Sequence, residues 1–172
     1  MEKANKKTKQ LQNKLFSLDT ELVLKTIEDL RKSGNIADVS ILIDLLVFSN
    51  NETVKEAIAS LLNDVKDVKI ISVLVQALSN EKYKSENTKL LAACWQSGLD
   101  YSVHIALFVD LMLGEKLETA IEAFTVIENQ ENMPQQDVAG KQIEKIKSEL
   151  ATANPSKQVF LLEAIHYFEK SA

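Results

Sequence analysis

The chain has few side chains suited to nucleophilic or metal-ligand chemistry, and their spacing does not gather them. Its two histidines, His104 and His166, have no second ligand at helical spacing of the His-x-x-x-His type, whereas zinc needs three or four convergent ligands. His104, Cys94 and either Asp100 or Asp110 would form a catalytic set only through the fold, because no nucleophile turn or local signature accompanies them. Chance proximity is the simpler interpretation. We expect no catalytic residues, no metal and no cofactor.

The composition is that of an ordinary globular protein with little capacity for tight turns. Of 172 residues, 45% are hydrophobic and 26% are charged, which suits a single domain over residues 1–172. Four glycines and two prolines are too few for a β-rich fold or a glycine-rich phosphate loop. No secretory leader and no apolar stretch of about 18 residues is evident. These features predict an all-α cytoplasmic protein without a membrane span.

Charge is unevenly distributed along the chain. Residues 1–18 hold five lysines against one glutamate, a local charge of +4, so a total of −5 leaves −9 for the remainder. An acidic body repels nucleic acid and anionic membranes, and both are disfavoured as partners. We expect residues 1–17 to form a basic, solvated N-terminal helix.

Apolar residues recur at helical spacing from about residue 11 onwards. Two apolar runs, 41–48 and 70–78, have the composition of buried strands, but their length and flanking caps favour helices. Glycine stops are expected at Gly34, in the left-handed conformation, and at Gly98. The expected helix starts are Asp38, Asn51, Asp67, Ser85, Ser102, Glu115, Pro134 and the Asn154–Pro155 pair.

Core positions repeat at a period of a little over thirty residues. Ala57, Leu90 and Ala123 are 33 positions apart, and on the following helices Leu42, Leu74 and Phe108 are 32 and 34 apart. A helix pair repeated at this period buries its apolar face only by stacking on its neighbours. The period predicts an α-solenoid of stacked antiparallel helix pairs.

The pattern resembles the HEAT repeat over about residues 18–130, which would hold three and a half to four repeats, with residues 131–172 closing the stack. Glu52 replaces the common proline, Lys55 replaces the usual arginine, and no proline kinks the second helix, so TPR or another helical-hairpin repeat stays open. The strings at 91–100 and 123–129 are also similar to a group of small bacterial HEAT-like proteins. The positions that carry the match are Val54, Lys55, Ala57, Ile58, Leu61, Leu62, Asp67, Leu74 and Leu78.

The resemblance implies a concave face lined by the second helix of each pair. Asp44, Gln76 and Asp110 occupy equivalent positions on these helices. A polar stripe on such apolar helices must face away from the core. It predicts a mildly acidic groove for a basic peptide or helix of a protein partner, with plain solvation of the stripe as the alternative.

The last helix is apolar around most of its circumference over residues 159–168. Either it folds back into the stack, or it leaves a patch for a partner or a second copy of the chain. Trp95 is expected to pack in the core or between repeats. We therefore expect a non-enzymatic interaction or scaffold module, with a homo-oligomer joined through the last helix as the alternative and a nucleic-acid binder as the less favoured one.

Overall fold

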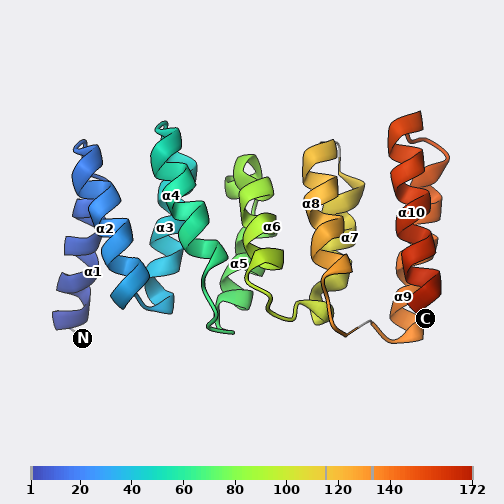
Figure 1. Cartoon of the computed structure of the whole chain (residues 1–172), viewed down its shortest axis with the longest axis horizontal. Coiled ribbons are helices and arrows are strands. Elements are labelled where there is room, and N and C mark those ends of the chain that lie inside the picture. Colours follow the sequence, from blue (N-terminus) through green and yellow to red (C-terminus); the bar gives the residue numbers. More distant parts are fainter. Residues whose placement is uncertain (1, 115, 133, 172) are drawn as a thin grey trace. The chain divides into compact units, whose positions relative to one another are not determined.

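A computed structural model describes the backbone of residues 2–114, 116–132 and 134–171, and the side chains of 6–114, 116–132 and 134–170. Within these ranges all regular secondary structure is helical, which confirms the all-α prediction (Figure 1). None of the described helices is both long and apolar enough to cross a bilayer. The chain divides into two compact units, residues 1–97 and 98–172, and each is described by itself.

The first unit is built from antiparallel helix pairs in two layers (Figure 1). One layer holds α2, α4 and α6, and the other holds α1, α3 and α5, with neighbours in each layer in contact. Leu42, Leu46, Ile58 and Leu74 are fully buried in this unit. The elements are α1 (Glu2–Leu15), α2 (Thr20–Ser33), α3 (Ile36–Phe48), α4 (Glu52–Asn63), α5 (Ile70–Leu78), the 3-10 helix η1 (Glu81–Glu86) and α6 (Asn87–Gln96).

The apolar run 41–48 lies in α3, as expected for a helix rather than a strand. Helix α3 contacts α1, α4, α5 and η1, so it is covered on most sides and an almost uniformly apolar sequence suits it. The run 70–78 coincides with α5. Both helical predictions are confirmed.

The second unit contains two helix pairs, α7–α8 and α9–α10, with α7 packed on α9 and α8 on α10. Its apolar contacts include rings in edge-to-face geometry, with Phe124 5.3 Å from Phe160 and 5.8 Å from Tyr167 between centroids. The elements are the 3-10 helix η2 (Ser102–His104), α7 (Ile105–Leu113), α8 (Leu117–Glu128), α9 (Gln136–Leu150) and α10 (Pro155–Ser171).

Two predicted caps are present as expected. The Asn51 side-chain oxygen accepts a hydrogen bond from the Val54 amide (3.4 Å) at the start of α4. The Asn154 oxygen accepts one from the Lys157 amide (3.0 Å) at the start of α10. Each satisfies an amide that the first helical turn would leave without a partner.

The predicted caps at Asp38, Asp67 and Ser85 are wrong. Helix α3 is capped by Asn35, and Asp38 sits three residues later as the reciprocal partner of a capping box. Asp67 accepts from the Lys69 amide (2.9 Å) in a turn that precedes α5. Ser85 lies inside η1, and α6 begins two residues after it.

The two glycine stops differ in conformation. Gly98 has φ +64° after α6, the left-handed conformation that glycine adopts without strain. Gly34 is not left-handed as predicted: its φ is −67°, and a Cβ there would lie 2.5 Å from the Leu30 carbonyl oxygen. Glycine is needed at position 34 for close packing. Helix α9 begins two residues after Pro134, and the predicted start at Glu115 lies outside the described residues.

Candidate functional site: a cation cage on helix α3

The three predicted groove residues do not share one unit. Asp44 lies on α3 and Gln76 on α5, two helices in contact within the first unit. Asp110 lies on α7 in the second unit. All three are at least partly exposed, as a polar stripe requires.

Asp44 is bound by two side chains of η1. Its Oδ1 atom forms an ion pair with the Lys82 ammonium and accepts a 2.8 Å hydrogen bond from the Tyr83 hydroxyl. Lys82 also donates a 3.2 Å hydrogen bond to the Tyr83 oxygen. The hydrogen bond to Asp44, with a smaller contribution from Tyr83, raises the pKa of Lys82 above its usual value, so this lysine remains a cation.

Two aromatic rings complete the surroundings of the Lys82 ammonium. The nitrogen lies 5.3 Å from the centroid of the Phe48 ring and 4.8 Å from that of Tyr83, within the roughly 6 Å over which a ring face attracts a cation. We call Asp44, Phe48 and Tyr83 the cage. The Asp44 and Lys82 side chains are 37% and 41% exposed, so the cage is open to solvent.

Local structure explains how the cage is assembled. Asp44 and Phe48 are four residues apart on α3 and therefore share one face of the helix. Tyr83 comes from η1, which packs on α3. The Asn80 side chain caps η1 by accepting from the Lys82 amide (3.0 Å), and the Asn80 carbonyl accepts from the Tyr83 amide (2.9 Å). These bonds hold Lys82 and Tyr83 against α3.

Beside the cage, α3 and α5 line a hollow of about 160 Å³. Gln76 and Ser40 contribute to its wall, and Tyr83 belongs to both the hollow and the cage. The hollow thus has Gln76 and Tyr83 in its wall, and the Tyr83 hydroxyl is bonded to Asp44. The use of Asp44 and Gln76 by a partner stays a prediction.

Asp110 has a similar electrostatic arrangement in the second unit. It forms an ion pair with Lys145 of α9, and the two side chains are 52% and 45% exposed. Both aspartates of the predicted stripe therefore have a lysine counterion within their own unit. Such exposed pairs contribute at most about 1 kcal/mol each.

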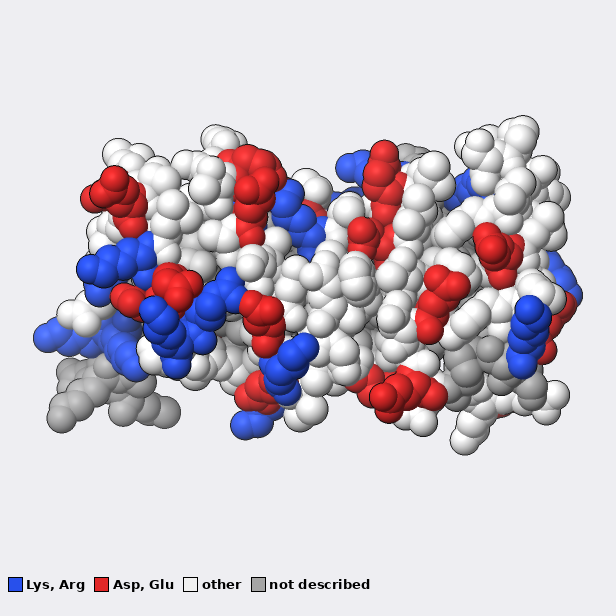
Figure 2. All heavy atoms as spheres, in the orientation of Figure 1, with Lys and Arg blue, Asp and Glu red and all other residues white. Residues whose placement is uncertain are grey.

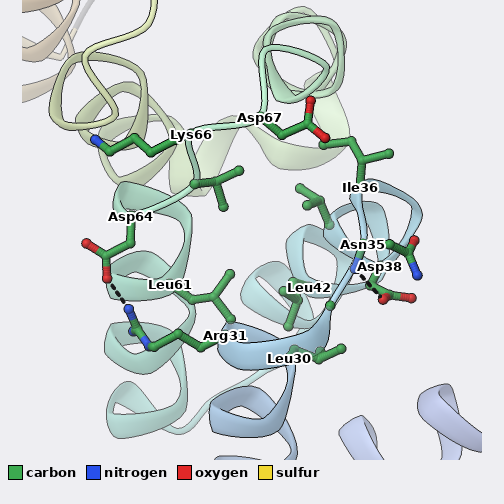
Figure 3. A pocket seen from close by; sticks show the side chains of 13 residues that line it. Leu30, Arg31, Asn35, Ile36, Asp38, Leu42, Leu61, Asp64, Lys66 and Asp67 are labelled. Carbon is green, nitrogen blue, oxygen red and sulfur yellow. Dashed lines mark hydrogen bonds and ion pairs between the residues drawn. The ribbon is translucent and has the colours of Figure 1, made fainter.

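A second cavity of about 290 Å³ lies between α2, α3 and α4 (Figure 3). Leu30, Leu42 and Leu61 form part of its wall, while the rim carries an ion pair between Arg31 and Asp64. Arg31 also donates to the Ser60 hydroxyl at 3.0 Å. The rim arginine is thus engaged in bonds that join α2 to α4.

Charged side chains of both signs alternate over the part of the first unit visible in Figure 2. Charged side chains also form a network between α4 and α6. Lys55 pairs with Glu86, whose side chain is only 7% exposed, and Lys89 bridges Glu86 (3.5 Å) and Glu52 (3.0 Å). The hydrogen bond from Lys89 lowers the pKa of Glu52. This network ties successive helix pairs together.

The residues considered for catalysis are divided between the two units. Cys94 is fully buried in the first unit, and His104 belongs to the second. Asp100 accepts from the Ser102 amide (2.8 Å) and the Asn132 amide group (3.0 Å), and these hydrogen bonds lower its pKa. In the described ranges no three His, Cys, Asp or Glu side chains are grouped to hold a metal ion. Trp95 is half-buried.

The last helix packs into its unit along most of its apolar face. Leu161, Ala164 and Phe168 are fully buried in contacts with α8 and α9. Val159 and Leu162 remain 68% and 53% exposed. The fold-back alternative therefore holds for the buried face of α10, whereas contact of the exposed residues with a partner or a second copy stays a prediction.

The sequence pattern does not indicate two of the cage residues, Phe48 and Tyr83, or the occupant Lys82. Phe48 was assigned to an apolar core run, and Lys82 and Tyr83 fall between two predicted helices, where periodicity carries no information. The usable signal is the pairing of a lysine and a tyrosine just after the Asn80 cap.

The chain matches no protein-family model, and no curated protein or solved structure is detectably similar to it. The resemblance to HEAT repeats stays a prediction. Function is therefore inferred from the chemistry of the cage.

Proposed function

We propose that the chain is a non-enzymatic interaction module, a HEAT-like stack of helical hairpins that binds a basic segment of a protein partner at the cage. Polar links between elements about one repeat apart support the stacked arrangement within each unit. In the first unit the Asn63 side chain donates to Gln96, 33 positions away, at 2.8 Å. In the second, the Asn132 side chain donates to Asp100, 32 positions away, at 3.0 Å.

The observation that carries the proposal is the occupation of the cage by Lys82. A carboxylate, a phenol oxygen and two ring faces already hold an ammonium group. An arginine from a partner would use the same groups more fully, because its planar guanidinium both stacks on rings and forks onto a carboxylate. The cage therefore selects a cation that carries N–H donors.

Displacement of Lys82 costs little. The Lys82–Asp44 pair is exposed, and such pairs contribute about 0–1 kcal/mol. The released ammonium returns to water. We expect affinity in the micromolar range or weaker for a short segment, about −8 kcal/mol at the strong end.

An unbiased peptide selection tests the proposal. A phage library of random dodecapeptides is selected on wild type, on Asp44→Lys and on Asp64→Lys. Asp64 is the matched control because it too forms an exposed ion pair in the first unit, with Arg31. Enrichment of arginine-rich or lysine-rich peptides on wild type and Asp64→Lys, but not on Asp44→Lys, supports the proposal. Equal enrichment of the same peptides on wild type and Asp44→Lys, or enrichment of peptides that are not rich in basic residues, contradicts it.

The exposed residues of α10 favour a second candidate, a homo-oligomer. Val159 and Leu162 offer two apolar contacts on one side of the helix. If a dimer forms through them, Leu162→Glu converts it to monomer in light scattering at micromolar concentration. Val103→Glu, an 85% exposed position of the same unit, leaves the dimer intact. A monomeric wild type removes this candidate.

A further inference from the structure

A groove of about 680 Å³ opens in the first unit between the α1–α2 loop and the α3–α4 loop. Its inner wall includes Leu45 and Val54, which are buried. At its mouth Phe16, Leu18 and Phe48 are 45%, 103% and 62% exposed. Exposed apolar side chains gathered in this way mark interaction sites more often than isolated ones do.

The groove is almost uncharged. Among the described side chains that line it, Glu52 is the one charged residue, and that carboxylate is bound by Lys89. The Asn51 side chain donates a 3.3 Å hydrogen bond to the Thr20 hydroxyl, which joins the two loops. The groove volume lies within the roughly 300–1,000 Å³ of ligand sites, so it accommodates a large apolar side chain.

Phe48 connects the groove to the cage. Its side chain lines the groove, and its ring also faces the Lys82 ammonium. A chain segment bound at the cage therefore has the groove within reach of its neighbouring residues. The charge complementarity of Asp44 for a cation determines which kind of segment arrives there.

We propose that the groove holds a large aliphatic or aromatic side chain of the same partner segment whose arginine or lysine occupies the cage. This inference rests on the proposed function and adds a second specificity determinant to it. The recognised partner carries a basic residue and a large apolar residue within a few positions of each other. The basic residue supplies orientation, and the apolar residue supplies most of the affinity, because burying its surface outweighs an exposed ion pair.

Defined peptides measure this directly. The parent is an acetylated and amidated Gly-Ser peptide with one arginine. Its derivatives carry one leucine two, three or four positions before or after that arginine. Each is titrated by NMR into wild type, Leu18→Ser and Val68→Ser. In the protein, Leu18 and Val68 are both exposed, Val68 at 65%. Val68 does not line the groove, which makes Val68→Ser the matched control.

At least one leucine peptide should bind wild type about 10-fold or more tightly than the parent. Leu18→Ser should lose most of this gain while it keeps the affinity for the parent, and Val68→Ser should keep both. The inference is overturned if all leucine peptides bind wild type within twofold of the parent while the parent still binds at the cage. Absence of any binding at the cage refutes the proposed function and the inference together. A wild-type dimer that Leu18→Ser dissociates would assign the groove to a second copy instead.

Discussion

The phenol of Tyr83 and the carboxylate of Asp44 are joined by a 2.8 Å hydrogen bond across 39 positions of sequence. This bond links η1 to the exposed side of α3. It also holds the carboxylate beside the Lys82 ammonium, which faces the Phe48 and Tyr83 rings, so that a cation in the cage receives both charge and π contacts. Lys82 is the cation that occupies it.

Lys82 acts as a tethered competitor, so its removal should strengthen binding. Lys82→Gln is expected to raise the affinity for acetyl-arginine amide by about two- to fivefold, the factor that an exposed ion pair of up to about 1 kcal/mol represents. Isothermal or NMR titration measures the change. Lys84→Gln is the control, since Lys84 pairs with Glu81 on the same 3-10 helix. An unchanged or lower affinity for Lys82→Gln would show that the lysine does not compete.

Removing one partner of the buried ion pair between Lys55 and Glu86 should lower the free energy of unfolding strongly. Replacing both partners with apolar residues should lower it much less. Glu86→Gln leaves a lysine side chain that is 16% exposed without its main partner, and we expect a loss of about 2–3 kcal/mol in the free energy of unfolding. The double variant Lys55→Met, Glu86→Leu should recover most of this loss. Urea denaturation measures both. Equal destabilisation by the single and double variants would refute the desolvation argument.

Two glycines should respond to alanine with opposite signs. Gly98 has φ +64°, so Gly98→Ala should cost about 1–2 kcal/mol in unfolding free energy. Gly140 lies within α9, and a Cβ there meets nothing within 4 Å, so Gly140→Ala should stabilise by about 0.5–1 kcal/mol. Thermal and urea unfolding report both changes. A destabilised Gly140→Ala would mean that the α9 backbone conformation is misassigned.

Acid should remove the stabilisation supplied by Asp100. Hydrogen bonds from Ser102, and then from Asn132, lower its pKa below the ordinary 3.8. A depressed carboxyl pKa adds stability that is complete above the unfolded-state value and is lost as pH falls through the folded-state value. The free energy of unfolding of wild type should therefore exceed that of Asp100→Asn by roughly 0.5 kcal/mol at neutral pH, a figure reduced for solvent screening. Urea unfolding from pH 7 to pH 2 should show the gap closing below about pH 4. A gap that is constant with pH would exclude a charge effect.

The helices can be predicted from the sequence because the spacing of apolar residues that indicates them is a local pattern. The helical prediction for the apolar runs 41–48 and 70–78 is confirmed, although the caps predicted at Asp38, Asp67 and Ser85 are wrong. Asp38 was misjudged because the capping box has two acceptors, and Asn35 three residues earlier is the true cap. Composition and periodicity suffice for helices, whereas cap identity depends on reciprocal hydrogen bonds.

Of the three cage residues, only Asp44 could be predicted from the sequence. The equivalent positions of Asp44 and Gln76 in the repeat predict exposed polar side chains, and both are at least partly exposed, because this prediction depends on helical geometry alone. The partners of Asp44 come from a 3-10 helix about 38 residues later, where no periodic pattern fixes a face. Long-range polar contacts of this kind require the three-dimensional structure.

The central claim is tested most directly by an NMR titration of the ¹⁵N-labelled protein with acetyl-arginine amide and with its neutral analogue, acetyl-citrulline amide. Arginine should shift the amide signals of Asp44, Phe48, Lys82 and Tyr83 in a saturable way. Citrulline should leave them unchanged, and Asp44→Asn should abolish the response to arginine. Equal shifts with citrulline, or shifts confined to other parts of the chain, would contradict a cation-binding cage on α3.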